Sequence, residues 1–461
     1  MRKKENKKII QKSIIMRKII MFLLVLLCIT YTQAQDWISN ESTLLCEDSL
    51  KSTKDVQTIE EYYPNVLLTT TNRNGTNHYA FRLWENGNPI FEGFLNDPRC
   101  VVSDVELVND SAYFCGYREV NGNDVGYIGR FNVHEFLGNQ NCVYEIMDIN
   151  PSSKLKKLVA YETYGKDHVV AIGTTQTNTA MIVDLFPDSV CNIFTNSSFP
   201  YEQLSDIAVG AKFVIIVGED TGSAKITVNR FMKHDLSSTS FPYQQHYKYN
   251  YNTITSLAPD AIFSYQVKVS YIGNYEMAMT TTAIGMNTND FYVLNSILNE
   301  GNLTITNTQA IPHNDKMIYL KDTEYDTLTG KLYILEDNNL DNTGKYTSYI
   351  IPINPRAETP YSINAIKPEK GYILNDIIPF SHDCKVIGAG VNSYSMQGLF
   401  AKNINSNIQY CNISIKLRPH FLGQIPYTSV FTYSPATYFY NWTPNHFQGS
   451  VLQQTIECES N

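Results

Sequence analysis

Short runs of alternating apolar and polar residues, separated by turn sequences, dominate the chain. The pattern is clearest in residues 101–133, VVSDVELVNDSAYFCGYREVNGNDVGYIGRFNV, where Val105, Leu107 and Tyr113 alternate with polar or small neighbours. A period of two predicts strands that bury one face. The Asn-Gly pair at 121–122 tolerates the positive φ angles of a tight hairpin. The stretch therefore predicts three antiparallel strands in a β-meander.

Further pairs of strand-like runs repeat this pattern along the chain. They are residues 66–71 and 78–83, 168–173 and 180–185, 213–218 and 224–228, 277–283 and 291–294, 331–336 and 346–353, and 385–390 and 398–401. They recur roughly every 50 residues, which is typical of propeller units. Because one such unit cannot bury its own apolar face, units pack side by side in a ring.

The repeats predict an all-β fold, with residues 36–461 forming a single β-propeller domain. Seven blades are favoured, with six or eight as alternatives. A pair of β-sandwiches with coincidental spacing is the competing interpretation. The many tyrosines and phenylalanines, 32 and 21, suit half-buried sheet faces.

Residues 1–35 have the features of a signal peptide. Met16, Arg17 and Lys18 supply a positive segment, residues 19–29 are apolar, and cleavage is expected near Ala34-Gln35. No later stretch is apolar over the roughly 18 residues that a membrane helix needs. We therefore expect an exported chain, secreted, periplasmic or at the cell surface, without a transmembrane span after cleavage.

The charge distribution bears on possible partners. The leader holds eight of the 36 basic residues and only one of the 45 acidic residues, so its removal makes the chain more acidic than the formal −9 of the whole sequence. The remaining basic residues are scattered. This balance argues against nucleic acids and anionic membrane surfaces as partners.

Eight cysteines follow the leader's Cys28, an even number that permits a disulfide framework in an exported protein. Cys46 and Cys458 lie near the two ends of the predicted domain, in the strand-like segments 42–47 and 452–458. We expect these segments to share the blade that closes the ring, because an open ring would leave unpaired strand edges. A Cys46–Cys458 disulfide is one hypothesis; local pairing or free thiols is the slightly favoured alternative.

One turn has oxygen-bearing side chains at alternate positions. Asp337, Asn339 and Asp341 resemble the first, third and fifth ligands of a calcium loop. Asn342 stands where such a loop needs glycine, and Ser348 stands where it needs a bidentate carboxylate. An ordinary polar hairpin turn is the favoured interpretation, and calcium is the one cofactor that the sequence suggests.

The same region carries a family resemblance. Residues 330–338, GKLYILEDN, resemble the G-x-L-Y-V-x-D-x-x-N strand of lactonase-like and NHL-like propellers. In lactonase-like enzymes a Glu and several Asn or Asp side chains at strand ends hold a central divalent ion. Corresponding residues are not found in the other repeats, so the resemblance implies the fold and does not carry over the activity.

An aromatic run is the candidate ligand-binding surface. Tyr243, Tyr247, Tyr249 and Tyr251 share one side if residues 241–251 are extended. Such a platform suits stacking on sugar rings or on a protein partner. The favoured alternative is an outer blade strand whose tyrosines pack on the neighbouring strand.

The sequence predicts a binding function more readily than a reaction. It contains no G-x-S-x-G, H-E-x-x-H or Walker motif. We expect a non-catalytic binding or adhesion module that holds a glycan, a peptide or an envelope protein on the propeller face. The alternative is a carbohydrate-active or lactonase-like hydrolase with a metal at the central channel, which would require carboxylates to converge there.

Overall fold

The structure is a computed structural model in which antiparallel strands predominate. It describes residues 38–40, 51–57, 65–73, 76–85, 88–138, 143–149, 152–186, 190–195, 202–220, 225–233, 245–249, 261–285, 291–313, 318–338, 347–357, 361–366, 372–380, 385–392, 397–404, 409–418, 424–426, 432–438 and 442–451. Its strands lie in a compact unit of residues Ile38–Glu457. The helix α2 (Val133–Gly138) is a single short turn of helix between strands, and in the described residues no helix is long and apolar enough to cross a membrane.

Four sheets each combine a meander of four consecutive strands with one strand from late in the chain. They are β2 (Lys51–Gln57), β3 (Asn65–Arg73), β4 (Thr76–Glu85), β5 (Asn88–Phe94) with β33 (Gln448–Val451); β6 (Cys100–Val108), β7 (Ser111–Val120), β8 (Asn123–Asn132), β9 (Val143–Asp148) with β32 (Thr443–His446); β10 (Ser153–Thr163), β11 (Lys166–Thr175), β12 (Ala180–Phe186), β13 (Val190–Thr195) with β31 (Thr432–Tyr438); and β14 (Glu202–Val209), β15 (Phe213–Asp220), β16 (Lys225–Met232), β17 (Gln245–Tyr249) with β30 (Gln424–Pro426).

The other two sheets complete the ring. In a nine-stranded sheet, β29 (Gln409–Arg418) joins two meanders, β18 (Ala261–Gly273), β19 (Glu276–Gly285), β20 (Phe291–Asn299), β21 (Ile305–Pro312) and β22 (Tyr319–Asp326), β23 (Lys331–Asn338), β24 (Thr347–Ile353), β25 (Tyr361–Ile366). The last sheet contains β26 (Tyr372–Phe380), β27 (Lys385–Asn392), β28 (Gln397–Ile404) and β1 (Ile38–Asn40).

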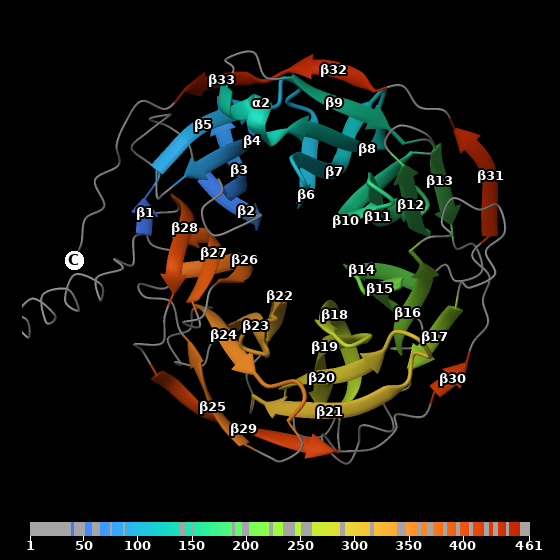
Figure 1. Ribbon diagram of the computed structural model, residues 1–461, viewed down its shortest axis with the longest axis vertical. Helices are drawn as coiled ribbons and strands as arrows, with labels where there is room; N and C mark the ends of the chain where they lie inside the picture. Colours follow the sequence, from blue (N-terminus) through green and yellow to red (C-terminus); the bar gives the residue numbers. More distant parts are fainter. Residues whose placement is uncertain are drawn as a thin grey trace, which may run out of the picture. The chain divides into compact units, whose positions relative to one another are not determined.

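The sheets stand around a centre, and the first strand of each meander faces it (Figure 1). This arrangement is a β-propeller, as the sequence predicted. The predicted strand pairs fall on the second and third strands of the meanders, for example residues 168–173 on β11 and 180–185 on β12. The described strands form seven meanders but six hydrogen-bonded sheets, so the seven-blade count for the whole chain stays a prediction.

The core lies between neighbouring meanders, because each central strand buries both faces. On β11, Val169 and Ala171 belong to a cluster shared with β7 and β8, whereas Val170 and Ile172 belong to one shared with β14 and β15. All four side chains are at most 1 % exposed. Burial on two sides explains why these strands are continuous runs of aliphatic residues rather than alternating ones.

The Asn-Gly pair forms the tight hairpin turn that the sequence predicted. Asn121 and Gly122 connect β7 to β8 with φ angles of 53° and 78°. Two positive φ angles in a two-residue loop define the hairpin turn whose twist matches that of the flanking strands. The predicted tight hairpin is confirmed.

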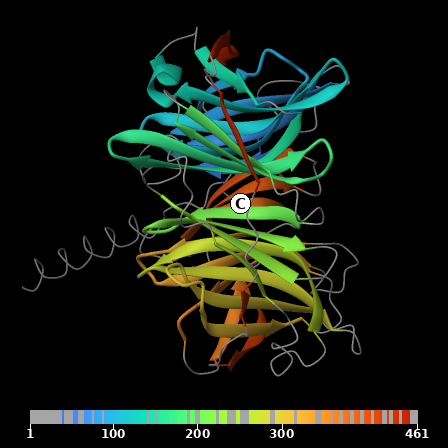
Figure 2. The same cartoon turned by 90° about the vertical axis from the view of Figure 1, so that its right-hand side faces the viewer.

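The chain after β28 adds one strand to each of five sheets. We call strands β29 to β33 the C-terminal belt; they pair, in this order, with β21 and β25, β17, β13, β9 and β5. They lie at the outer edge of the ring (Figure 1), and Figure 2 shows a red belt strand on the side of the ring. The belt thus visits the meanders in the reverse of their order in the sequence.

The N-terminal strand also contributes to ring closure. Ile38 to Asn40 pair with Leu399 to Ala401 of β28, so the first strand completes the last sheet. The predicted closing segments 42–47 and 452–458 lie outside the described residues, and with them Cys46 and Cys458. Their disulfide stays a prediction. Cys100 and Cys191 are buried free thiols.

Candidate ligand-binding cavity at the centre of the ring

The strands that face the centre share a backbone irregularity. We call β2, β6, β10, β14, β18, β22 and β26 the inner strands. Six of them skip one residue in their pairing with the next strand, between Thr53 and Asp55, Val102 and Asp104, Leu155 and Lys157, Leu204 and Asp206, Leu320 and Asp322, and Leu374 and Asp376. In β18 the corresponding shift lies earlier, between Ser264 and Gln266.

In β6, β10, β14, β22 and β26, the bulge places two adjacent residues in the lining of the central cavity. In β10, Leu155 and Leu158 are fully buried in the core, whereas Lys156 and Lys157 between them line the central cavity. A regular strand would have sent one of the two lysines into the core. The bulge therefore presents two polar residues where simple alternation allows one.

Glycines on the second strands make room for the bulges. A Cβ atom on Gly116, Gly173 or Gly218 would collide with a carbonyl oxygen of the neighbouring inner strand, that of Val101, Lys154 or Gln203. Because the obstructing atoms belong to the backbone, a larger residue cannot be accommodated by a side-chain rotation. Inner-strand bulge and second-strand glycine thus form one structural unit in these three meanders.

Carboxylates at the bulges tie neighbouring inner strands together. Asp104 Oδ2 accepts a hydrogen bond from the Leu158 amide at 2.7 Å, and Asp206 Oδ2 accepts one from the Val269 amide at 2.8 Å. In β18, Lys268 therefore stands level with the bulge residues of the other inner strands. These hydrogen bonds supply acceptors to two amides, and they couple β6 to β10 and β14 to β18.

An ion pair between a half-buried lysine and a buried aspartate lies in this layer of the channel. Lys157 Nζ is 3.0 Å from Asp206 Oδ1. Burial alone lowers the pKa of Lys157, but the carboxylates of Asp206, Asp104 and Asp322 outweigh it and leave that pKa well above its ordinary value. For the carboxyl group of Asp206, burial has the opposite effect and raises the pKa. The positive charges of Lys157 and Lys268 and the hydrogen bond from the Val269 amide outweigh burial and leave the pKa of Asp206 below its ordinary value. Both groups therefore carry their charges at neutral pH.

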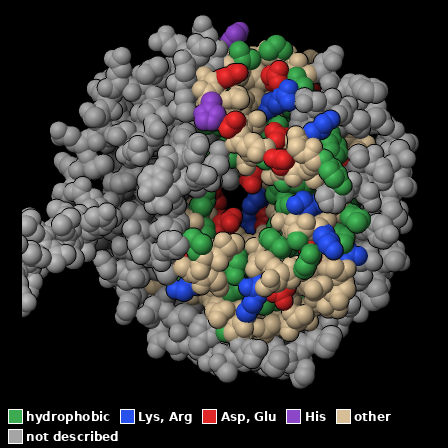
Figure 3. Space-filling model, in the orientation of Figure 1, with side chains coloured by type: hydrophobic (Ala, Val, Ile, Leu, Met, Phe, Trp, Pro, Cys, Tyr) green, Lys and Arg blue, Asp and Glu red, His purple; other side chains and the backbone are tan. Residues whose placement is uncertain are grey.

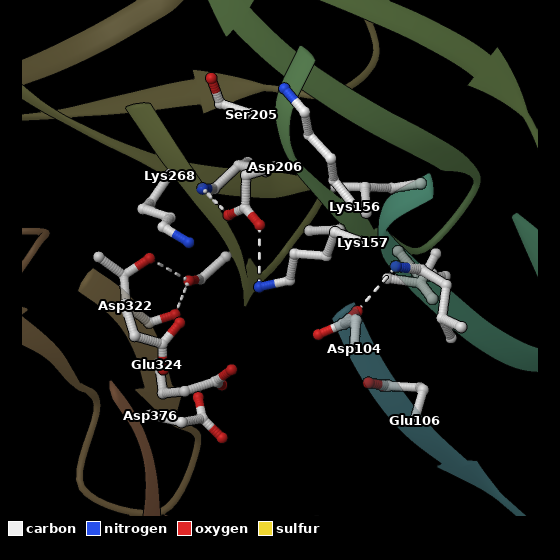
Figure 4. A pocket seen from close by; sticks show the side chains of 18 of the residues that line it. Asp104, Glu106, Lys156, Lys157, Ser205, Asp206, Lys268, Asp322, Glu324 and Asp376 are labelled. Atoms are coloured by element: carbon white, nitrogen blue, oxygen red, sulfur yellow. Dashed lines mark hydrogen bonds and ion pairs between the residues drawn. The ribbon is translucent and has the colours of Figure 1, made fainter. Parts of the chain in front are cut away.

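The inner strands enclose a cavity of about 470 Å³. Figure 3 shows it as a hollow at the centre of the ring, with acidic and basic side chains at its edge. The charged side chains that line it, labelled in Figure 4, are Asp104, Glu106, Lys156, Lys157, Asp206, Lys268, Asp322, Glu324 and Asp376, together with Lys321.

A second pair of titratable groups lies beside the cavity. Burial raises the pKa of Glu219 on β15 to about 7, an effect that the positive charge of Lys156 partly offsets. Burial also lowers the pKa of Lys156, against the influence of Glu219. Glu219 is thus a cavity-flanking group whose charge changes near neutral pH.

The predicted metal ligands are only partly described. Asp337 lies at the end of β23, where its Oδ1 accepts a hydrogen bond from Ser348 Oγ at 2.5 Å and its Oδ2 is 3.3 Å from Lys321 Nζ. Asn339 and Asp341 lie outside the described residues, so calcium there stays a prediction. Within the described part of the chain, no three His, Cys, Asp or Glu side chains are grouped closely enough to hold a metal.

The tyrosine run falls on a strand with neighbours at both edges. Tyr247 pairs with Val228 of β16 and with Pro426 of β30, and Tyr249 pairs with Ile226 and Gln424. Tyr243 and Tyr251 lie outside the described residues. The backbone arrangement matches the predicted outer strand, while ligand binding by these tyrosines stays a prediction.

The charged channel residues were missed in the sequence, although a signal for them exists. An apolar residue, any residue, a charged residue and an apolar residue recur as VSDV at 102–105, LKKL at 155–158, LSDI at 204–207 and LNDI at 374–377, and LKDT at 320–323 differs only in its final threonine. The pattern interrupts the period of two. A search restricted to alternation therefore passes over it.

Comparisons with known proteins give a similar fold at low identity. No family model and no curated protein matches the sequence, so the resemblance to lactonase-like and NHL-like propellers has no support from a family match. Similar solved structures include the Dos1 propeller (10% identity, 74% of this chain and 76% of that one, TM-score 0.41), a phage phi92 endosialidase (11%, 89% and 76%, 0.37) and a Bombyx mori GH32 β-fructofuranosidase (9%, 80% and 93%, 0.29).

Proposed function

We propose that this protein is a non-catalytic binding module that holds a polar ligand, such as a peptide or a glycan, in the cavity at the centre of the propeller. The observation that carries the proposal is the charged cavity itself. Its bulges place adjacent polar side chains in a volume of about 470 Å³, which lies within the range typical of small-ligand pockets.

The ionisation of the central pair, Lys157 and Asp206, suits charge-based binding. A general acid or base works best with a pKa near the operating pH. The pKa of Lys157 is instead raised and that of Asp206 lowered, so both groups keep fixed charges. Fixed charges orient a ligand without exchanging protons with it.

The test combines ligand binding with a measurement of turnover. A set of charged tripeptides and a set of oligosaccharides are titrated calorimetrically into the protein and into the cavity variants Lys268→Met and Glu324→Gln. Matched control variants are Lys166→Met and Glu162→Gln, at exposed positions beside the β10–β11 turn. Mass spectrometry then shows whether each probe is recovered unchanged.

We expect at least one probe to bind, to be recovered intact, and to lose about tenfold or more in affinity in a cavity variant while the control variants bind normally. Consumption of the probe would favour the hydrolase alternative. Binding that no cavity substitution alters would place the ligand site elsewhere, and an absence of binding to either probe set would overturn the proposal.

A further inference from the structure

The turns that connect the first and second strands of consecutive meanders lie side by side. Asn109, in the β6–β7 turn, donates a hydrogen bond through Nδ2 to Asp167 Oδ1, beside the β10–β11 turn, at 3.0 Å. At the next boundary, Lys233 Nζ donates to the carbonyl oxygen of Gly210, in the β14–β15 turn, at 3.3 Å. The same Nζ lies 5.0 Å from the ring centroid of Tyr161, near the end of β10.

Two further contacts extend this row of turns. Lys212 Nζ, in the β14–β15 turn, lies 5.2 Å from the ring centroid of Tyr275 in the β18–β19 turn. Arg356 joins that turn to the end of β22, because it donates hydrogen bonds to Glu276 at 2.9 Å and to the Tyr325 hydroxyl at 3.0 Å. Five consecutive turns, from β6–β7 to β22–β23, therefore form one surface, which we call the hairpin face.

The hairpin face carries exposed apolar side chains. The described residues include three large apolar side chains that are exposed, Tyr164 at 84 %, Leu328 at 63 % and Tyr275 at 48 %, and all three lie in these turns. Single exposed apolar residues are common on protein surfaces. Three of them in equivalent turns of one face are not scattered, and they indicate a surface that another molecule covers.

Two of these side chains are held in a strained backbone conformation. Tyr164 and Tyr275 have φ angles of 51° and 61°, each in a two-residue loop between paired strand residues. A bulky residue is disfavoured at positive φ. Because both rings are exposed, the fold gains little from them in return. Strain that is retained at an exposed position points to a role outside folding.

An exposed lysine accompanies each of the two tyrosines. Lys166 follows Tyr164 by two residues in the same hairpin, and the ammonium group of Lys212 lies against the ring of Tyr275. A tyrosine ring beside an ammonium group offers apolar contact and a cation at one point of a surface. Such a pair suits a partner that combines apolar side chains with carboxylates.

A protein segment fits this surface better than a membrane does. Asp167 and Glu276, which adjoin Lys166 and Tyr275 in the sequence, already accept hydrogen bonds within the protein. The lysines of the hairpin face would also attract an anionic membrane, but the whole chain is acidic, with a formal charge of −9, and a membrane of that sign repels it. An acidic peptide segment needs to meet only the hairpin face.

We propose that the hairpin face docks an acidic segment of a partner protein, with Tyr164 and Tyr275 as apolar anchors and Lys166 and Lys212 as the cations that pair with its carboxylates. Tyrosine is among the residues that contribute most to protein interfaces. These four residues lie outside the lining of the central cavity. The inference therefore goes beyond the proposed function and does not depend on it.

The test uses a displayed library of random short peptides as its probe. Peptides selected on the protein are titrated into the parent and into the double variants Tyr164→Asn/Tyr275→Asn and Lys166→Gln/Lys212→Gln. Asparagine tolerates positive φ, so the tyrosine variant keeps both turns and should melt no lower than the parent. Lys154→Gln is the matched control, because Lys154 is exposed at the opposite end of β10.

We expect the selected peptides to combine Asp or Glu with apolar residues. They should bind each double variant at least about tenfold more weakly than the parent. Binding to Lys154→Gln should equal that of the parent. Because the tyrosine variant is at least as stable as the parent, its loss of affinity cannot come from unfolding.

Other results would overturn the inference. They are a selection that enriches no peptide, enriched peptides without an acidic bias, and enriched peptides of which none depends on the two tyrosines. Two further measurements address other occupants. Tyrosine-dependent cosedimentation with vesicles of phosphatidylcholine and phosphatidylglycerol, without tyrosine-dependent peptide binding, would make the surface a membrane contact. Self-association in analytical ultracentrifugation that the tyrosine variant abolishes would make it an interface between copies of the chain. Either result would replace the acidic segment as the occupant.

Discussion

Two hairpin turns with the same backbone geometry differ in how well their residues suit it. Asn121-Gly122 and Tyr164-Gly165 each form a two-residue loop with two positive φ angles, 53° and 78° in the first and 51° and 69° in the second. Asparagine tolerates this conformation, whereas a bulky side chain is strained in it. Tyr164 is 84 % exposed, so little burial offsets the strain.

We therefore expect Tyr164→Asn to raise the free energy of unfolding by about 1 kcal/mol. The reciprocal substitution Asn121→Tyr should lower it by a similar amount at the other turn. Urea unfolding of both variants measures the two effects. Changes of the same sign in the two variants would show that the turn conformation is not what sets the difference.

A buried histidine makes the stability depend on pH. Burial lowers the pKa of His313 from 6.5 to about 4. The imidazole is therefore uncharged at neutral pH, and its 3.4 Å approach to Glu336 is not an ion pair. Below pH 6.5 the unfolded chain takes up a proton here that the folded protein does not, so stability falls between pH 6.5 and about 4.

The expected contribution of His313 over this window is about 3 kcal/mol. Glu219 has the opposite effect on stability over this pH range. Its pKa is raised from 4.5 to about 7 in the folded protein, so its stabilising contribution is fully present below pH 4.5 and is lost as the pH rises toward 7. The contribution of His313 is therefore measured as the difference in pH dependence between the parent protein and a His313 variant. The unfolding free energy of His313→Gln should fall less than that of the parent protein between pH 6.5 and 4; equal slopes would contradict the assignment.

At the scale of single elements, the inner-strand bulge and the glycine beside it depend on one another. A Cβ atom on Gly173 would lie well inside van der Waals contact with the carbonyl oxygen of Lys154. We expect Gly173→Ala to displace the β10 bulge and to cost about 2–3 kcal/mol of stability. Chemical denaturation measures the loss.

Gly122→Ala is the matched control for that substitution. Nothing lies within 4 Å of a Cβ atom at Gly122, although its φ of 78° disfavours alanine. Its cost should be about 1 kcal/mol, from backbone strain alone. Equal losses for the two variants would mean that the bulge at β10 yields easily to the added methyl group.

The two classes of strand were not equally predictable from the sequence. The second and third strands are apolar runs bounded by turn residues, because both of their faces are covered, and pattern alone located them. The inner strands carry Lys156 and Lys157 or Ser205 and Asp206 together on one face. In the sequence, such adjacent polar pairs resemble loop residues unless a bulge is assumed. The fold was therefore predictable from the sequence, but the candidate site was not.

The belt strands were unpredictable for a different reason. β30 spans three residues, Gln424–Pro426, and β32 spans four, Thr443–His446. Strands this short have no readable period, and their partners β17 and β9 lie far away in the sequence. Only the assembled sheets define where these segments pair.

For the whole ring, the belt adds contacts that the meanders do not make alone. Outer strands leave unpaired backbone groups at the edge of a sheet, and edges of this kind invite aggregation. The belt pairs with the fourth strands of six meanders. It also contributes Phe447, whose ring packs 4.6 Å from Tyr144 and 5.5 Å from Phe131 between ring centroids.

Phe447 should therefore anchor the last two belt strands to the core between the first two meanders. Its side chain is 6 % exposed, and Phe447→Ala should cost about 3–5 kcal/mol. Because Phe447 lies between β32 and β33, the substitution should also raise amide hydrogen exchange in both strands. The control is His446→Ala, at an exposed neighbouring position, which should change stability by less than about 0.5 kcal/mol. Exchange measured by mass spectrometry distinguishes the causes: lost stability with unchanged exchange in β32 and β33 would show that Phe447 supports the aromatic core but does not hold the belt.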